Sequence, residues 1–184
     1  MDRANFYLAA ALITACTTVS VFLLTRLADW GSAARQRRRL KRRFVIALHA
    51  EIDFNTTDMA IFVRDSPPMA LVERRIMRDR KLVPHVTDAR HTHIYRAGMA
   101  DISVVDKGLI GQIVHFYGLL DKLSAQVDGL AKPSFGLISA KGRVAAVREV
   151  YDTAAECAEV GKRVLTGLEK KYPVYRLKRI PRDR

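Results

Sequence analysis

The clearest pattern in this chain lies in residues 139–172, SAKGRVAAVREVYDTAAECAEVGKRVLTGLEKKY. Apolar or small side chains recur there at alternating intervals of three and four residues: Val144, Val147, Tyr151, Ala154, Ala158, Gly161, Leu165 and Leu168. Because this spacing aligns one stripe along an α-helix, we expect a long helix that begins near Ser139 and stops at Pro173. The small residues in its middle permit close backbone approach, so we expect another helix to cross there.

A second long helix is expected from about Ser32 to Arg64. Its apolar stripe comprises Val45, Leu48, Ile52, Asn55, Met59 and Phe62, and a neighbouring strip comprises Ile46, Phe54 and Ile61. A helix that is apolar on two sides packs against more than one neighbour. We therefore expect this helix to have more than one neighbour.

A third long helix is expected from Lys107 to about Val127, capped by Asp106. Gly111 and Gly118, seven residues apart, are expected to mark close helix packing. Shorter helices are expected at 69–81, with Ser66 as N-cap, and at 87–98, and a loop is expected at 129–135. Nothing after residue 44 alternates as a strand does. The predicted fold is therefore an all-α bundle of three long helices and one or two short ones.

The N-terminal segment differs in kind, because residues 4–25 (ANFYLAAALITACTTVSVFLLT) contain no charged side chain. As a helix they span about 33 Å, which matches a hydrocarbon core of about 30 Å. The sequence thus predicts one transmembrane helix within residues 1–30. A cleaved signal peptide is the first alternative, although residues 19–24, apart from Ser20, stay apolar past any plausible cleavage site. Lipid modification of Cys16, in the lipobox-like stretch 13–16, is the second.

The positive charge lies in two flanks. The 184-residue chain has 32 Lys and Arg against 19 Asp and Glu, a net charge of +13. Residues 26–43 hold eight basic and one acidic side chain (+7), and residues 169–184 hold seven and two (+5). Because basic residues beside a membrane span favour the cytoplasmic side, we expect residues 26–184 in the cytoplasm and the N-terminus outside. The two cysteines exclude a disulfide-stapled scaffold and a four-cysteine zinc site.

Several short motifs fit this picture. They are Ala50-Glu51-Ile52 followed by Asn55, then Ile94-Tyr95, then Val114-His115-Phe116-Tyr117, and the late helix. In these the chain resembles a group of uncharacterised bacterial membrane-anchored helical proteins, over most of its length. The resemblance implies a bacterial inner-membrane setting and carries no activity or binding residue.

The strongest candidate for a binding segment is the basic run after the apolar segment: Arg35, Arg37, Arg38, Arg39, Lys41, Arg42 and Arg43. Cytoplasmic leaflets are anionic, so we expect these side chains to bind lipid headgroups as well as to fix the topology. The same run could contact nucleic-acid phosphates, but no aromatic platform or recognition motif accompanies it. Nucleic acid is therefore the less favoured partner.

Asn55 is a polar residue within an apolar stripe, with Glu51 one turn earlier. It could bind a ligand or partner, but we favour a hydrogen bond that fixes packing register, and expect Asn55→Leu to cost packing specificity. His85, His91 and His93 cluster within nine residues without a Cys or an HExxH motif, so surface or capping roles are favoured over metal binding.

No nucleophile elbow, phosphate-binding loop or acid–base carboxylate pair is recognisable. We therefore expect no enzymatic activity, catalytic residue or cofactor. The expected organisation is an anchor (1–30), a basic juxtamembrane segment (31–43), a helical bundle (44–172) and a basic tail (173–184).

The predicted function is that of an interaction protein, an accessory subunit or assembly factor of a membrane complex. The predicted partner is that complex or a second copy. The seam Val144, Val147, Tyr151, Ala154, Ala158, Gly161 and Leu165 is the predicted interface, although an internal helix could equally occupy it.

Overall fold

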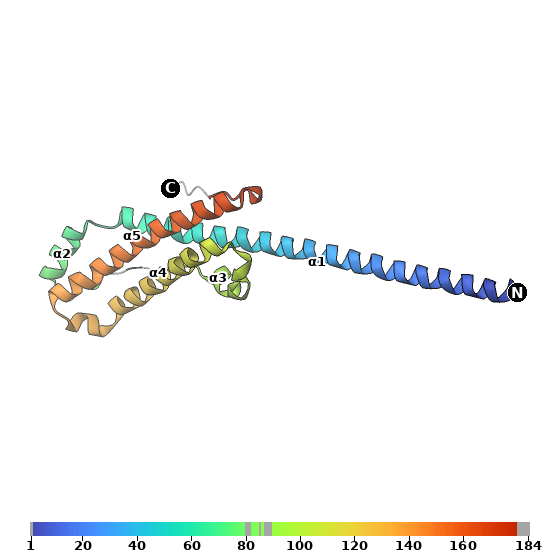
Figure 1. Ribbon diagram of the computed structural model, residues 1–184. Coiled ribbons are helices and arrows are strands. Elements are labelled where there is room, and N and C mark those ends of the chain that lie inside the picture. The colour runs from blue at the N-terminus through green and yellow to red at the C-terminus, as the bar shows by residue number, and fades with distance from the viewer. Residues whose placement is uncertain (1, 80–81, 85, 87–89, 180–184) are drawn as a thin grey trace. The chain divides into compact units, whose positions relative to one another are not determined.

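The computed structural model describes residues 2–79, 82–84, 86 and 90–179, except for the side chains of residues 2–16, 24, 27–29, 33 and 101. All regular structure in these residues is helical, which confirms the predicted all-α class. The elements are α1 (Asp2–Asp65), α2 (Met69–Arg78), α3 (His93–Ala97), η1 (Met99–Val104), α4 (Lys107–Ala131), η2 (Pro133–Leu137), α5 (Ala140–Lys171) and η3 (Pro173–Tyr175) (Figure 1).

The chain divides into two compact units, Met1–Arg43 and Phe44–Arg184. The first unit is the N-terminal part of α1. Within the residues whose side chains are described, no helix is both long and apolar enough to cross a membrane. Residues 4–16, more than half of the uncharged segment, lie outside those described side chains.

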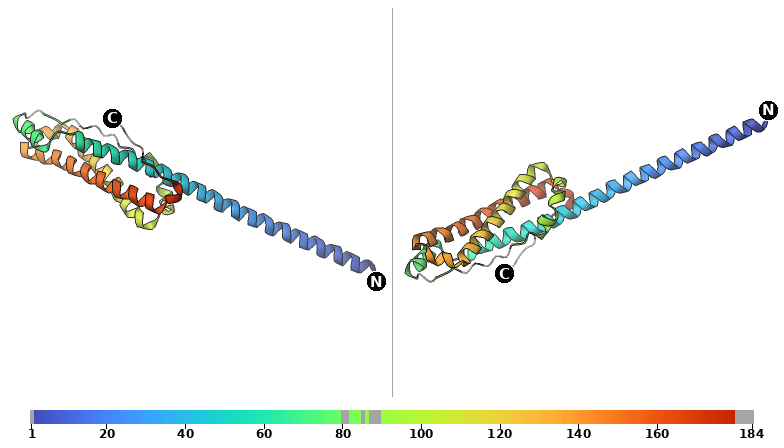
Figure 2. Two further views of the ribbon diagram at one scale, coloured as in Figure 1. Left: turned by 90° about the horizontal axis from the view of Figure 1, so that it is seen from above. Right: turned by 90° about the horizontal axis from the view of Figure 1, so that it is seen from below.

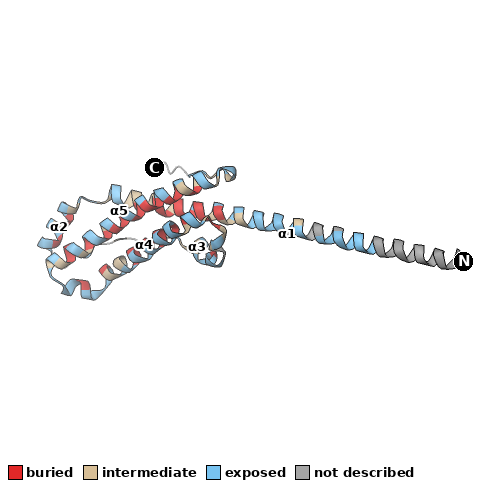
Figure 3. Cartoon of the chain, in the orientation of Figure 1, coloured by how far each residue is buried: buried red, intermediate tan, exposed pale blue. Residues whose placement is uncertain are grey.

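The second unit is a bundle in which α4, α5 and the part of α1 after Phe44 lie side by side (Figure 2). Buried residues follow the facing sides of these three helices (Figure 3). From α1 the core takes Val45, Leu48, Ile52 and Met59, as predicted. From α4 it takes the predicted Ile113, Phe116, Tyr117, Leu120 and Leu123.

The second apolar strip of α1 does not form a core face. Ile46 is 39% exposed, and Phe54 and Ile61 are only half-buried. The prediction that this helix packs against more than one neighbour is confirmed, because Glu51 contacts Tyr117 of α4 and Thr56 contacts Gly161 of α5. Those contacts are made by residues outside the second strip, which therefore remains the less buried of the two.

Two of the predicted helix starts are confirmed by their caps. The Asp106 carboxylate accepts the Gly108 N–H at 3.1 Å, and the Ser139 hydroxyl accepts the Gly142 N–H at 3.1 Å. The predicted cap at Ser66 is wrong, because its N–H donates to the Phe62 carbonyl and so ends α1. The next helix, α2, begins only at Met69, after an extended Pro68.

The turn between α4 and α5 is more ordered than the predicted loop. α4 continues to Ala131, and Pro133 then begins the 3₁₀ turn η2. Phe135 in this turn is buried, at 4% exposure. Burial of the large aromatic side chain of Phe135 therefore orders a turn in a segment that the sequence predicted to be a loop.

The space around each glycine shows whether a neighbouring helix packs closely against it. At Gly161 an added Cβ would collide with Thr56 of α1 and lie 2.8 Å from the Phe116 ring of α4. The predicted close crossing at the middle of α5 is thus confirmed. Gly111 and Gly118 have nothing within 4 Å of an added Cβ and are exposed, so the predicted close packing at these two residues is wrong.

Candidate functional site

The basic cluster of α1 is exposed to solvent. Arg35, Arg37, Arg38, Arg39, Arg42 and Arg43 are all exposed, whereas Lys41 is half-buried and has a contact within the chain. Consecutive helical residues are about 100° apart and 1.5 Å apart along the axis. The seven cations are therefore packed into about 12 Å of helix and spread over about two-thirds of its circumference, with Gln36 and Leu40 on the remaining side.

The predicted partner seam of α5 lies inside the chain's own core. Val147, Ala154 and Leu165 are 1%, 0% and 1% exposed, and Val144 and Ala158 are also buried. Gly161 lies against Thr56 and Phe116, and only Tyr151 of the seven residues is half-buried. Since α1 and α4 already cover this stripe, the expectation of an intermolecular groove here is corrected: the stripe is an internal seam.

A buried carboxylate, Glu51, organises the polar centre of the bundle. It is 7% exposed and lies on α1. Its two oxygens accept the Ile94 N–H at 2.6 Å, the Tyr95 N–H at 2.9 Å and the Tyr117 hydroxyl at 2.6 Å. The first two donors belong to the opening turn of α3, so Glu51 places a negative charge at that helix start.

Asn55, one turn further along α1, holds the segment just before α3. Its amide oxygen accepts the His91 N–H at 2.8 Å, and its amide nitrogen donates to the His91 carbonyl at 2.6 Å. The same nitrogen also donates to the Glu51 carbonyl at 2.9 Å. The predicted hydrogen bond between two helices is not what Asn55 makes: it holds the backbone of a loop, because His91 rather than a second helix lies beside its amide.

Aromatic packing completes this cluster, which we call the Glu51–Asn55 clamp (Glu51, Asn55, His91, Tyr95 and Tyr117). The Tyr95 and Tyr117 rings stack with centroids 3.7 Å apart and planes 4° from parallel. Burial, and secondarily the hydrogen bond to the Glu51 carboxylate, raises the pKa of Tyr117 far above its usual value.

The Glu51 carboxylate, the Asn55 amide and the Tyr117 hydroxyl all have partners within the chain. A paired buried network rigidifies a fold but leaves little capacity to bind a ligand. The clamp therefore ties residues 91–95, in the segment between α2 and α4, onto α1.

The histidines do not converge on one point. The His91 ring packs edge-on against Phe54 at 4.1 Å, while His49 lies at 3.2 Å from Glu169 on α5. His85 lies outside the described residues. In the part of the chain that the structure describes, no three metal-ligating side chains come together.

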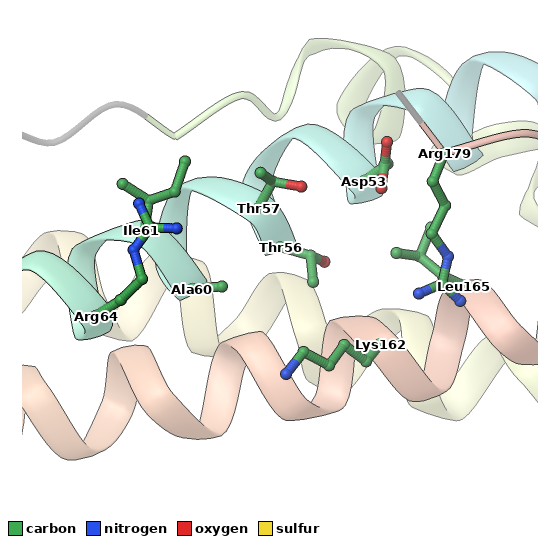
Figure 4. A pocket seen from close by; sticks show the side chains of 9 residues that line it. All are labelled: Asp53, Thr56, Thr57, Ala60, Ile61, Arg64, Lys162, Leu165 and Arg179. Carbon is green, nitrogen blue, oxygen red and sulfur yellow. The ribbon is translucent and has the colours of Figure 1, made fainter. Parts of the chain in front are cut away.

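A cavity of about 380 Å³ lies between α1 and α5 (Figure 4). Its lining includes three cations, each already paired: Arg64 with Asp65 at 2.7 Å, Lys162 with Glu159 at 2.7 Å, and Arg179 with Glu169 at 2.8 Å. The carboxylate of Asp53 adds a negative charge to the lining. Carboxylates of the same chain thus neutralise the three cations, and the cavity does not favour an anionic ligand.

One structurally important residue gave no signal in the sequence. Arg143, at the start of α5, is 2% exposed and donates to the carbonyls of Ile76 at 3.3 Å and Asp79 at 3.4 Å. These carbonyls lie at the C-terminal end of α2, where a cation is stabilised by the helix dipole. A single arginine beside an apolar stripe does not reveal such a partner, because the partner is backbone distant in sequence.

No family model, curated protein or solved structure matches this chain. The functional argument therefore depends on the chain's own exposed surfaces.

Proposed function

We propose that this protein is a single-pass membrane-anchored interaction protein, an accessory subunit or assembly factor of a bacterial inner-membrane complex. Its N-terminus lies outside the membrane, residues 26–184 are cytoplasmic, and residues 35–43 bind anionic headgroups. The helical bundle presents its outer surface, rather than the internal seam of α5, to the complex or to a second copy.

The observation that carries this proposal is the succession of two exposed surfaces along α1. Val19, Val21, Phe22 and Leu23 are between 54% and 58% exposed, within the uncharged segment 4–25. Neighbouring large apolar side chains left in water are costly, whereas lipid would cover them favourably. The exposed arginines begin at Arg35, about 15 Å of helix beyond Thr25, so a segment that lies along the membrane surface would bring them to the anionic headgroups.

The mechanism that follows is tethering. An anchor confines the bundle to the membrane surface and so raises its effective concentration toward a membrane-embedded partner. The Glu51–Asn55 clamp holds the backbone of residues 91–95 against α1, and a segment ordered before binding loses less entropy on docking.

The test is fractionation of the tagged full chain. We expect it to stay with the membranes in high salt and in carbonate and to dissolve only in detergent, whereas a variant lacking residues 1–30 should be released. Pelleting of that variant in high salt, where binding of the basic residues to headgroups is screened, or release of the full chain by salt alone, would contradict the anchor. Stoichiometric co-purification of a membrane protein after gentle extraction would support the accessory-subunit role, and a lone monomer would contradict it.

A second candidate function is a membrane-tethered nucleic-acid-binding module that uses the basic flanks. The exposure of arginines around most of the circumference of α1 favours it, because phosphate contacts require only accessible cations. It predicts that generic DNA is retarded in a gel by the full chain, and that retardation disappears with rising salt and with residues 37–43 neutralised. Retardation that survives both changes would contradict a phosphate-only mode.

A further inference from the structure

An exposed apolar tip lies at the end of the bundle where the second unit begins. Phe44, its first residue, packs its ring against Gly98, next to the turn η1. At the same end the Asp106 N–H donates to the Tyr172 hydroxyl at 2.8 Å, just before the turn η3. Figures 1 and 2 both show η1 and η3 at this end. In η3 the side chain of Val174 is 83% exposed.

The turn that presents Val174 is fixed by contacts on both sides. The rings of Tyr172 and Tyr175 stack with centroids 5.3 Å apart, and the Tyr175 N–H donates to the Tyr172 carbonyl at 3.0 Å. Arg176 then adopts a left-handed backbone with φ of 51°, and its N–H donates to the Pro173 carbonyl at 3.1 Å. The fold therefore holds an apolar side chain outward in an ordered turn.

Four cations belong to the same end of the bundle as this tip. Lys107 at the start of α4, Lys170 near the end of α5, Arg176 and Lys178 are all exposed. No partner for these four side chains occurs among the described residues. The nearby acids Asp106 and Glu169 are already paired, with Lys171 at 2.9 Å and Arg179 at 2.8 Å.

A fixed apolar tip with such cations at the same end of the bundle fits the interface of an anionic bilayer. The cations meet the headgroups while the apolar side chain enters the boundary of the acyl chains. Met99 in η1, 44% exposed, adds a second apolar side chain at this end. A nucleic-acid backbone would use the cations but has no counterpart for aliphatic side chains.

We propose that the bundle docks on the anionic leaflet through this end, the η3 face (Met99, Lys107, Lys170, Val174, Arg176 and Lys178). The inference rests on the proposed function, since binding of residues 35–43 to headgroups brings the adjoining Phe44 end to the surface. Residues 26–43 as a helix measure about 27 Å, so a segment standing upright would hold the η3 face clear of the headgroups. Contact between the η3 face and the lipid therefore distinguishes a docked bundle from one that residues 26–43 hold upright.

The test places one tryptophan at a time in the full chain, in a Trp30→Phe background, and reconstitutes each variant in vesicles containing brominated lipid. Val174→Trp reports on the η3 face, and Phe22→Trp reports on the predicted anchor. Leu137→Trp is the matched control, because Leu137 is 87% exposed in η2 at the opposite end of the bundle. Each variant is first checked for unchanged helicity and thermal unfolding.

We expect bromine to quench the fluorescence of the Val174→Trp variant, and its emission to shift to the blue, in vesicles rich in phosphatidylglycerol. The Leu137→Trp variant should keep its emission. Quenching of the Val174→Trp variant should be lost in pure phosphatidylcholine and on adding K170Q, R176Q and K178Q together. The same three changes should leave quenching of the Phe22→Trp variant unaltered.

Quenching of the Phe22→Trp variant without quenching of the Val174→Trp variant would overturn docking and leave the anchor standing. If neither variant is quenched and the protein does not float with vesicles, the anchor fails as well. Equal quenching of the Leu137→Trp and Val174→Trp variants would also overturn the assignment of the η3 face. The assignment would likewise be overturned if DNA changed the emission of the Val174→Trp variant while brominated lipid did not quench it.

Discussion

Gly161→Ala offers the sharpest test of the helix crossing in the bundle. On an exposed helix, replacing glycine by alanine stabilises a protein by about 1 kcal/mol. At Gly161 the new Cβ would instead collide with the hydroxyl of Thr56 and lie 2.8 Å from Cε2 of Phe116. Phe116 is fully buried and Thr56 is 4% exposed, so neither side chain has free space to move into.

The expected magnitude follows from these two opposing effects. Overpacking a well-packed core costs about 1–3 kcal/mol, and contacts with two buried neighbours favour the upper end. After the gain in helix propensity is subtracted, we expect the free energy of unfolding to fall by about 2 kcal/mol. Gly118→Ala is the control, because nothing lies within 4 Å of its added Cβ, and it should stabilise α4 by about 1 kcal/mol.

The assay is chemical denaturation of the full chain in mild detergent, followed by circular dichroism. A double-mutant cycle with Thr56→Ala adds a second criterion. The Thr56 hydroxyl has no hydrogen-bond partner among the described residues, so its removal breaks no bond there and frees space for the methyl group added at position 161. We expect this pair to recover at least about 1 kcal/mol relative to additivity. Stabilisation by Gly161→Ala alone, equal to that at Gly118, would refute the close crossing.

Three further outcomes are expected from buried or paired side chains. Glu51→Ala leaves two backbone N–H groups and one hydroxyl without their acceptor. The free energy of unfolding should therefore fall by about 3 kcal/mol or more. A fall below about 1 kcal/mol, measured by chemical denaturation, would contradict the clamp. Cys157 is fully buried, and this burial raises the pKa of its thiol to about 12. In a Cys16→Ser background we therefore expect iodoacetamide to label Cys157 only after the protein unfolds. Rapid labelling of the native protein would argue against this burial. The hydrogen bond from Arg179 lowers the pKa of Glu169 from its usual 4.5, so their pair stabilises the fold above that pH and is lost as the pH falls through the lowered value. Arg179→Gln should therefore reduce stability at neutral pH but not in strong acid, as a pH series of melting curves would show.

Features that depend on residues close together in the sequence were predictable, whereas those that depend on distant residues were not. The apolar stripes of α1, α4 and α5 were predictable, because periodicity along one helix requires no knowledge of its neighbours. The caps at Asp106 and Ser139 were predictable for the same reason, since each bonds to an N–H two or three residues later. The prediction at Ser66 was wrong because the proline pair after it delays the next helix.

The candidate sites show a similar division. Asn55 was recognised as a polar residue within a core stripe, yet its partner His91 lies 36 residues away. The link from Glu51 to Tyr117 spans 66 residues, so no local pattern announces it. The α5 seam was identified correctly as a packing stripe, but only the positions of Thr56 and Phe116 established that the same chain fills it.

The sequence by itself determined the helical class, the stripe that each long helix buries, and the concentration of positive charge in two flanks. These properties depend on residue type and on spacing within one helix, which the chain carries locally. The tertiary structure alone decided which surface remains free. It buried the seam, paired the cations around the α1–α5 cavity, and left Val174 outward among lysines and an arginine that have no partner in the described part of the chain. Exposure is a property of what packs against a residue, and that is decided by contacts between segments far apart in the chain.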